Sequence, residues 1–233
     1  MSGRVPVALT IAGSDSGGGA GVELDLKVFG ALGVFGACAI TALTAQNSQE
    51  VRATWEAPAE VVTAQLEAVL DDLPVGAAKT GMLACESIVR AVAAVLRERR
   101  AGGAGLALVV DPVVVAKDGS RLLSEAGLVA LREELLPLAT LVTANVPEAE
   151  ALSGERIEGE QGAWRAAEKL RALGCSWVLV KGGHLAGRAA TDYLLGPDGA
   201  QALSSPRRSG GPYHGTGCAL SAAITAAEVS IHR

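Results

Sequence analysis

Aromatic residues are scarce in this sequence, and basic residues are not in excess. Phe, Trp and Tyr make up 3% of the 233 residues, whereas 49% are hydrophobic and 29 are glycine. With a formal net charge of −5, the chain does not match a nucleic-acid-binding protein, which needs clustered Lys and Arg. Its basic run at 97–100 falls at the end of an expected helix, where cations suit the helix dipole. The composition therefore favours an α/β enzyme scaffold packed with Ala, Val and Leu.

Paired cysteines and long apolar runs are lacking as well. The four cysteines are scattered, with no Cys-x-x-Cys pair and no spacing typical of metal ligands. No signal peptide and no apolar run of membrane-spanning length is recognisable. We therefore expect a cytoplasmic protein whose cysteines are free thiols. These cysteines are Cys38, Cys85, Cys175 and Cys218.

Expected strands alternate with expected helices along most of the chain, without an internal repeat or a convincing linker. This alternation predicts a parallel α/β sheet between helical layers, with right-handed crossovers, in one domain covering 1–233. The expected strands are 5–11, 36–43, 51–55, 77–80, 106–110 and 140–143, then 177–180 and a hairpin of 191–195 with 200–203. The expected helices are 20–32, 58–72, 86–100, 124–135, one after 145, and 159–173.

A glycine-rich loop at 13–21 follows the first expected strand and leads into a helix. It lacks the Gly-Lys-Ser/Thr ending of a P-loop and does not fit the dinucleotide-binding fingerprint. Its five glycines predict a backbone that bends closely around a ligand. The alternative is a loop that is merely flexible.

A second glycine turn, His214–Ser221, opens the last expected helix. Free N–H groups and the positive end of a helix dipole make such a turn an anion site. Cys218 lies in the first helical turn, where the same field is expected to lower its pKa. The alternative is an ordinary tight turn with Thr216 as N-cap and a buried thiol.

Polar residues follow several expected strands, and parallel topology would gather them at one edge of the sheet. Such a set suits phosphoryl transfer, which depends on positioning and charge neutralisation. Asp111 and Glu148 would hold a divalent ion such as Mg²⁺, and Lys181 would neutralise phosphate charge. Cys218 would take the proton of the attacking hydroxyl, a step typically worth ~10²–10⁴ in rate. Singly, each residue also has an ordinary structural explanation. The set is Asp25, Gln46, Asp111, Asn145, Glu148, Lys181 and Cys218.

Seven segments, in order from residue 5 to about 225, resemble the hydroxymethylpyrimidine/phosphomethylpyrimidine kinases of the ribokinase-like superfamily. They are Thr10–Gly21, Ile40–Asn47, Lys79–Leu83, Asp111–Lys117, Asn145–Glu150, Lys181–His184 and His214–Cys218. The resemblance implies a ribokinase-like three-layer α/β/α sandwich. It also implies two ATP-dependent steps of thiamine biosynthesis: phosphorylation of 4-amino-5-hydroxymethyl-2-methylpyrimidine, then of its monophosphate. Relatives are commonly homodimers and typically continue beyond the point where this chain ends, so the domain is expected to be short at its C-terminus.

The resemblance also implies residue roles. The pyrimidine side would be formed by Gly13, Asp25, Gln46 and Met82. The ATP side would involve Asn145, Lys181 and Gly183, with Mg²⁺ near Asp111 and Glu148. The anion hole would comprise Gly215, Thr216 and Gly217. Cys218 stands where most members of the superfamily carry an aspartate base.

Three other functions stay open at this point. A kinase of the same fold could act on pyridoxal or pyridoxine, whose ring is similar in size and also carries a hydroxymethyl group. The chain could bind a pyrimidine without catalysis. Cys218 could also perform covalent cysteine chemistry, although only His214 lies nearby in sequence as a partner.

Overall fold

A single eight-stranded sheet organises the chain, in the order β10-β9-β8-β7-β6-β5-β1-β2. The computed structural model describes residues 5–103, 105–115, 121–187, 189–207 and 214–231. Six neighbouring strands pair in parallel, and β9 and β10 are antiparallel. The parallel strands are β1 (Val7–Ala12), β2 (Phe35–Ile40), β5 (Val75–Thr80), β6 (Ala107–Val110), β7 (Leu141–Asn145) and β8 (Trp177–Lys181). The hairpin consists of β9 (Ala189–Gly196) and β10 (Gly199–Pro206).

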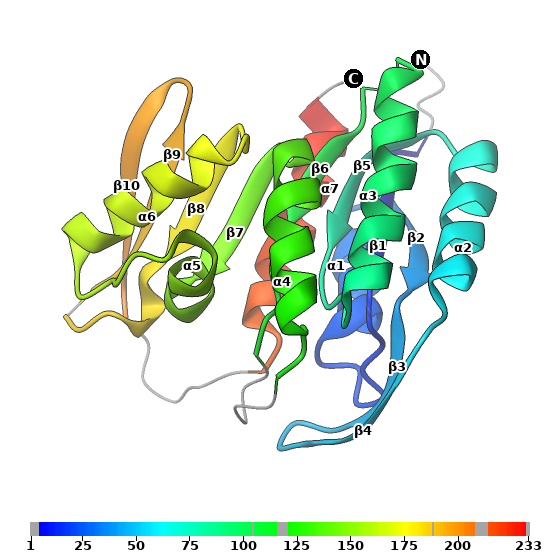
Figure 1. Ribbon diagram of the computed structural model, residues 1–233, viewed down its shortest axis with the longest axis horizontal. Helices are drawn as coiled ribbons and strands as arrows, with labels where there is room; N and C mark the ends of the chain where they lie inside the picture. The colour runs from blue at the N-terminus through cyan, green and yellow to red at the C-terminus, as the bar shows by residue number, and fades with distance from the viewer. Residues whose placement is uncertain (1–4, 104, 116–120, 188, 208–213, 232–233) are drawn as a thin grey trace.

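Helices cover both faces of the sheet (Figure 1). One face carries α1 (Gly21–Ala31) and α7 (Thr216–Ile231), which contact each other and the strands β1, β5 and β6. The helices on the other face are α2 (Ala59–Asp72), α3 (Glu86–Ala101), α4 (Glu125–Ala130), α5 (Val146–Ser153) and α6 (Glu160–Ala172). This arrangement confirms the expected three-layer, mostly parallel α/β fold.

The hydrophobic core is divided by the sheet. Its larger part lies under α2–α6 and consists mainly of Val, Leu, Ile and Ala. The smaller part, under α1 and α7, includes Phe29, the largest fully buried side chain among the described residues. Burying such a side chain is worth about 1.5–3 kcal/mol. No helix in the described parts of the chain is long and apolar enough to span a membrane.

The expected strand 36–43 is wrong in one respect, because the chain leaves the main sheet at Thr41. Its backbone N–H bonds to Ala12 and its hydroxyl donates to the carbonyl of Met82 at 2.6 Å. After this turn, β3 (Ala42–Gln46) pairs antiparallel with β4 (Val51–Glu56) in a separate two-stranded arm. The strand therefore extends beyond the expected end at 43, and Gln46 lies at the end of β3.

The expected helix 124–135 is also interrupted. After α4 it widens into a π-helical turn at Leu131–Leu135, followed by a 3₁₀ turn at Leu136–Leu138 that contains Pro137. Proline cannot donate a helical hydrogen bond, which explains why the helix stops there. Within the motif segments named above, residues 116 and 117 lie outside the described ranges.

Candidate functional site

The carboxyl ends of β1, β5, β6, β7 and β8 meet at the edge from which the β3–β4 arm projects, the lower edge in Figure 1. A cavity at this edge lies below the N-terminus of α7. Its wall is partly apolar, with Ala12, Met82, Val113 and Leu122. The other lining residues are Gly13, Ser14, Asp15, Ala20, Gly21, Gln46, Lys79, Gly81 and Cys218.

The glycine loop 13–21 is ordered around a buried carboxylate that the sequence did not single out. Asp15 is 1% exposed and accepts backbone N–H bonds from Gly17 at 2.8 Å, Gly19 at 3.1 Å and Ala20 at 2.9 Å. Burial raises the pKa of Asp15, but the bonds from His214, Gly17 and Gly19 together lower it below its usual value. The loop is therefore held by a specific set of bonds and is bent closely around its own Asp15 carboxylate, whereas its expected role in binding a ligand stays a prediction.

His214 joins the two glycine segments. Its Nε2 lies 2.9 Å from Oδ2 of Asp15. Gly215 has a φ of +78°, and a Cβ there would lie 1.8 Å from the carbonyl oxygen of Gly19. An L side chain would therefore be strained and would collide with backbone. Glycine at 215 allows the turn before α7 to touch the loop after β1.

Cys218 lines the cavity in the first turn of α7, but its pKa differs from the expectation. Burial raises the pKa of the thiol above its ordinary value, and Asp111 and Asp25 raise it further. Lys79 and the backbone N–H of Gly21 oppose this effect without overcoming it. The expected lowering by the helix terminus is therefore wrong, because desolvation of the anion outweighs the dipole.

Lys181, Asp111 and Ser221 form a network beside the N-terminus of α7. Lys181 Nζ lies 3.2 Å from Asp111 Oδ1, and the Ser221 hydroxyl donates to Asp111 Oδ2 at 3.0 Å. A Cβ at Gly217 would lie 3.4 Å from Lys181 Nζ. Because Gly217 has no side chain, the space between the first turn of α7 and the Lys181 ammonium is free of side-chain atoms from this position. A helix N-terminus beside a lysine suits the binding of an anion.

Asn145 and Glu148 hold each other in a capping box at the start of α5. The Asn145 side chain accepts from the Glu148 N–H at 2.9 Å, and Glu148 Oε2 accepts from the Asn145 N–H at 2.8 Å. Burial, and then the charge of Asp111, raise the pKa of Glu148 to about 7 despite the opposing charge of Lys181. The spacing Asn-x-x-Glu thus has a structural role as well as the expected chemical one.

The donor set fits Mg²⁺ only in part. No group of three His, Cys, Asp or Glu side chains within the described ranges is arranged to hold a metal ion. Two carboxylates near a lysine instead suit an ion that takes most of its ligands from water and phosphate. Asp111 is 2% exposed and Glu148 is 6% exposed, so both carboxylates are largely shielded from water.

Asp25 does not reach the cavity wall. It is fully buried on α1, where its Oδ2 accepts from Thr10 at 2.6 Å and from Lys79 at 2.8 Å. By contrast, Gly13, Gln46 and Met82 do line the cavity. Gly183 is exposed in the short turn Gly182–His184, and Thr216 is exposed at the start of α7.

Sequence reasoning passed over Asp15, Lys79 and Ser221. Asp15 sits in a Ser-Asp-Ser-Gly sequence typical of turns in which a side chain binds following N–H groups. Lys79 is a charged residue inside an otherwise apolar expected strand, which signals a paired buried charge. Ser221 lies three residues after Cys218, on the same face of the helix.

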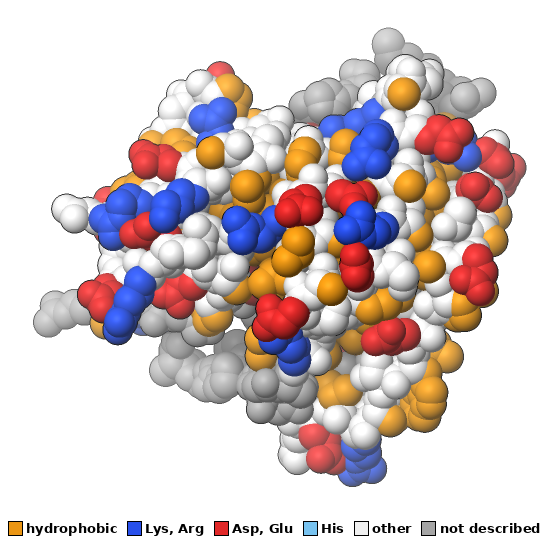
Figure 2. All heavy atoms as spheres, in the orientation of Figure 1, with side chains coloured by type: hydrophobic (Ala, Val, Ile, Leu, Met, Phe, Trp, Pro, Cys, Tyr) orange, Lys and Arg blue, Asp and Glu red, His pale blue; other side chains and the backbone are white. Residues whose placement is uncertain are grey.

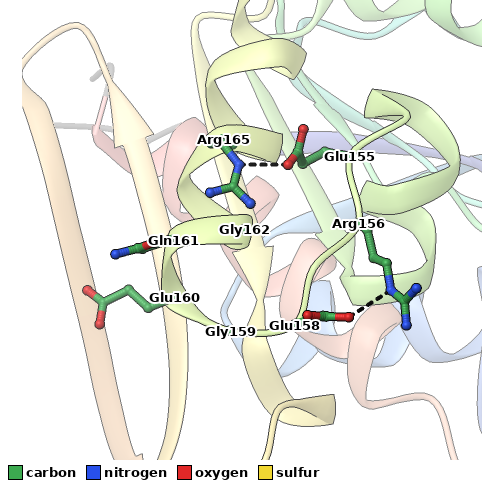
Figure 3. A pocket seen from close by; sticks show the side chains of 8 residues that line it. All are labelled: Glu155, Arg156, Glu158, Gly159, Glu160, Gln161, Gly162 and Arg165. Carbon is green, nitrogen blue, oxygen red and sulfur yellow. Dashed lines mark hydrogen bonds and ion pairs between the residues drawn. The ribbon is translucent and has the colours of Figure 1, made fainter.

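A larger hollow, of about 600 Å³, lies on the surface at the start of α6 (Figure 3). Its rim carries the ion pairs Arg165–Glu155 and Arg156–Glu158, and none of its lining residues lines the cavity at Cys218. Acidic and basic side chains are also interspersed over the helical face in Figure 2. Self-paired surface charges of this kind do not form a site, so the smaller cavity remains the candidate.

Comparisons with known proteins agree with the motif resemblance. Residues 15–232 match the family model described as phosphomethylpyrimidine kinase. A hydroxymethylpyrimidine/phosphomethylpyrimidine kinase of Rhizobium meliloti is 49% identical over 94% of this chain and 81% of its own length. Bacillus subtilis pyridoxal kinase, solved as an ADP complex, superposes with a TM-score of 0.88 at 37% identity, covering 97% of this chain and 85% of that one. Clostridium difficile phosphomethylpyrimidine kinase gives a TM-score of 0.84 at 38% identity, covering 97% and 91%.

The raised pKa of Glu148 has a consequence for stability. Between its ordinary pKa of 4.5 and the folded value of about 7, the folded protein binds the proton more tightly, so stability falls as the pH rises through this range. We expect Glu148→Gln, which stays neutral, to raise the Tm of the metal-free protein at pH 8 by several degrees, at about 2–4 °C per kcal/mol. Near pH 4.5 the two proteins should melt together in a thermal shift assay.

The control is Glu155→Gln, because Lys169 and Arg165 lower the pKa of Glu155. This variant should not gain stability at pH 8. An equal Tm change for Glu148→Gln at both pH values would contradict the assignment of the raised pKa.

Proposed function

The chain belongs to the phosphomethylpyrimidine kinase family, and from this premise we propose that its reaction takes place in the cavity below α7. It is a hydroxymethylpyrimidine/phosphomethylpyrimidine kinase of thiamine biosynthesis. The observation that carries the proposed location is the single cavity wall that contains both Gln46 and Cys218. The side with Gln46 suits a nitrogen-containing ring such as a pyrimidine. The side with Cys218 lies at the N-terminus of a helix, which suits a phosphate group.

The pyrimidine side is proposed to consist of Gly13, Gln46 and Met82. Gln46 accepts from the Thr44 hydroxyl at 3.2 Å, which orients the amide. An amide can pair with both a ring nitrogen and an amino group of an aminopyrimidine. A Cβ at Gly13 would lie 3.2 Å from the Met82 sulfur, so glycine gives Met82 room to pack against the ring. Asp25 would not contact the pyrimidine and would act only through Lys79, which lines the cavity.

The phosphate side is proposed to consist of the N–H groups of Gly215, Thr216 and Gly217 together with Lys181. The relative from Bacillus subtilis was solved with ADP, which supports ATP as the phosphate donor. Asn145 and Gly183 would face the nucleotide. Arg207 bonds to the carbonyl of Gly183 at 2.8 Å and so fixes the turn after β8.

Mg²⁺ is proposed to bind between the phosphates and the carboxylates of Asp111 and Glu148. When bound, it would neutralise charge on the transferred phosphoryl group. Lys181 keeps its charge beside these acids, because Asp111 and Glu148 raise its pKa against the effect of burial. The ion and the ammonium would therefore act on the same phosphate oxygens.

Cys218 is proposed as the base for the substrate hydroxyl. Because its pKa is raised, the resting residue is a thiol, and only the deprotonated fraction can accept a proton. Phosphoryl transfer through a loose transition state tolerates this, since positioning and charge neutralisation supply most of the rate.

The reaction itself is tested by measuring ADP release with ATP, Mg²⁺ and either the pyrimidine alcohol or its monophosphate. We expect turnover with both acceptors and none without an acceptor. The superposition on a pyridoxal kinase makes pyridoxal the necessary comparison, and its kcat/KM should be at least about tenfold lower. Preference for pyridoxal, or failure of both pyrimidines to release ADP, would contradict the proposed function.

The role of Cys218 predicts a characteristic pH profile. We expect log kcat/KM to rise with pH at a slope of about one between pH 7 and 8.5, because the thiol must lose its proton first. Cys218→Ser should lose about 100-fold or more, since a hydroxyl is a far weaker acid. Cys218→Asp should move the rise to lower pH, because a carboxyl ionises earlier.

Cys85→Ser is the matched control, because Cys85 does not line the cavity, and it should keep the parent profile. Glu148 titrates in the parent and in both Cys218 variants alike, so a shift specific to Cys218→Asp isolates the base. An identical profile in Cys218→Asp and the parent would remove Cys218 from this role.

A homodimer is proposed from the exposed apolar face of the β3–β4 arm. Leu43 and Trp55 are cross-strand partners and are 54% and 61% exposed. A pair of exposed apolar side chains of this kind suits an interaction surface, and a second copy of the chain would cover it by two-fold symmetry.

Analytical ultracentrifugation should give twice the chain mass, and the double variant Leu43→Ser/Trp55→Ser should give the monomer mass. Leu203→Ser, which changes an exposed leucine on β10, should leave the dimer intact. A monomeric parent protein at micromolar concentration would refute this proposal.

A further inference from the structure

Lys79 is a fully buried ammonium for which the mechanism above has no role. It lies on β5, its side chain is 0% exposed, and its Nζ is 2.8 Å from Asp25 Oδ2. The pair joins the central sheet to α1 behind the cavity. Because Lys79 lines the cavity and Asp25 does not, the lysine is the member of the pair that faces the site.

Stability does not explain this pair. A buried ion pair usually contributes no more to folding than well-packed apolar residues of the same size, because both charges must leave water. Here the desolvation is incompletely compensated, since Asp25 Oδ1 has no hydrogen-bond partner among the described residues. Thr10 and Lys79 both use Oδ2. A charged pair kept under such conditions points to function.

The ammonium of Lys79 has hydrogen-bond donors to spare in the wall that it shares with Cys218. A Cβ at Gly81 would lie 2.9 Å from the Cβ of Ala12, so glycine at this position permits the close approach of the backbone after β5 to the end of β1. An ammonium has three N–H donors, and Asp25 takes one of them. Burial lowers the pKa of Lys79, but Asp25, Cys218 and Asp111 raise it above its usual value, so the group stays charged.

The groups that face Cys218 come from four elements. Lys79 on β5 is the strongest influence that favours its anion, followed by the Gly21 N–H at the start of α1. Asp111, after β6, and Asp25 on α1 disfavour the anion. Lys181, at the end of β8, also interacts with the sulfur charge.

Resting on the proposed function, we propose that Lys79, held in place by Asp25, is a positioning residue that stabilises the anionic sulfur of Cys218 at the cavity wall. The thiol first gives its proton to solvent. The sulfur then takes the proton of the substrate hydroxyl, while the hydroxyl oxygen bonds to the γ-phosphorus of ATP and the bond between that phosphorus and the β,γ-bridging oxygen breaks. ADP leaves with the negative charge. Lys79 touches neither reacting oxygen and acts through the sulfur.

Two variants test this proposal, and the first removes both charges. Lys79→Met/Asp25→Asn leaves no unpaired buried charge, and Thr10 can still donate to the new amide. The rate of Cys218 alkylation by iodoacetamide at pH 7.5 is read by peptide mass spectrometry, with Cys85 as the internal reference. We expect this rate to fall about tenfold, kcat to fall about 10- to 100-fold and the pyrimidine KM to stay within about threefold.

The second variant, Asp25→Asn alone, keeps a side-chain oxygen that accepts from Lys79 and so holds the lysine in place, but it removes the negative charge that opposes the sulfur anion. Cys218 alkylation should then become about threefold faster or more, the opposite direction from the double variant. The alkylation rate of Asp25→Asn tests the link between Lys79 and Cys218 even if the double variant does not fold. Lys169→Met, the same substitution at a half-exposed lysine on α6, should match the parent in every measurement.

The results that overturn the proposal are distinct. An alkylation rate that is unchanged or slower in Asp25→Asn, or unchanged in a folded double variant, refutes the link between Lys79 and the sulfur. A KM increase above tenfold with kcat retained shows that the pair binds substrate instead. Absence of kinase activity in the parent protein would refute the proposed function, whereas the alkylation rates would still report on Lys79 and Cys218.

Discussion

The site depends on one contact, between the loop that leaves β1 and the turn that enters α7. Asp15 gathers three backbone N–H groups of its own loop and binds His214 from the other end of the chain. Gly215 permits this approach, because a Cβ there would overlap the carbonyl of Gly19. A carboxylate with this many donors is strongly held in its charged form. The N-terminus of α7 is thereby fixed against β1, and Cys218 faces the same cavity as Gln46.

Buried charge is the second constraint, and it separates two halves of the edge. Lys79 and Asp25 form one pair, between β5 and α1, whereas Lys181 and Asp111 form another, between the end of β8 and the segment after β6. Each lysine keeps its charge because acids surround it, against the effect of burial. Such pairs contribute little to folding. They place two fixed cations close enough to Cys218 to interact with its charge.

Sequence reasoning gave the alternation of strands and helices, and the gathering of polar residues at one edge, because both follow from local periodicity and from parallel topology. Sequence reasoning did not predict the β3–β4 arm. The chain turns at Thr41 because this residue bonds to Ala12 and Met82, which are distant from it in sequence. The partner of Lys79 could not be predicted for the same reason, because Asp25 lies 54 residues away. The pKa of Cys218 was misjudged because a local dipole is visible in sequence, whereas desolvation depends on the whole fold.

The capping box gives the Asn-x-x-Glu motif a structural explanation, and the same geometry is compatible with the chemical role proposed for Asn145 and Glu148. The capping box uses one oxygen of each side chain to begin α5. It also fixes Glu148 where burial and Asp111 raise its pKa to about 7. Because ionised Glu148 is costly in this buried position, a nearby cation would stabilise it, and the capping box holds the carboxylate in one place for the Mg²⁺ proposed above.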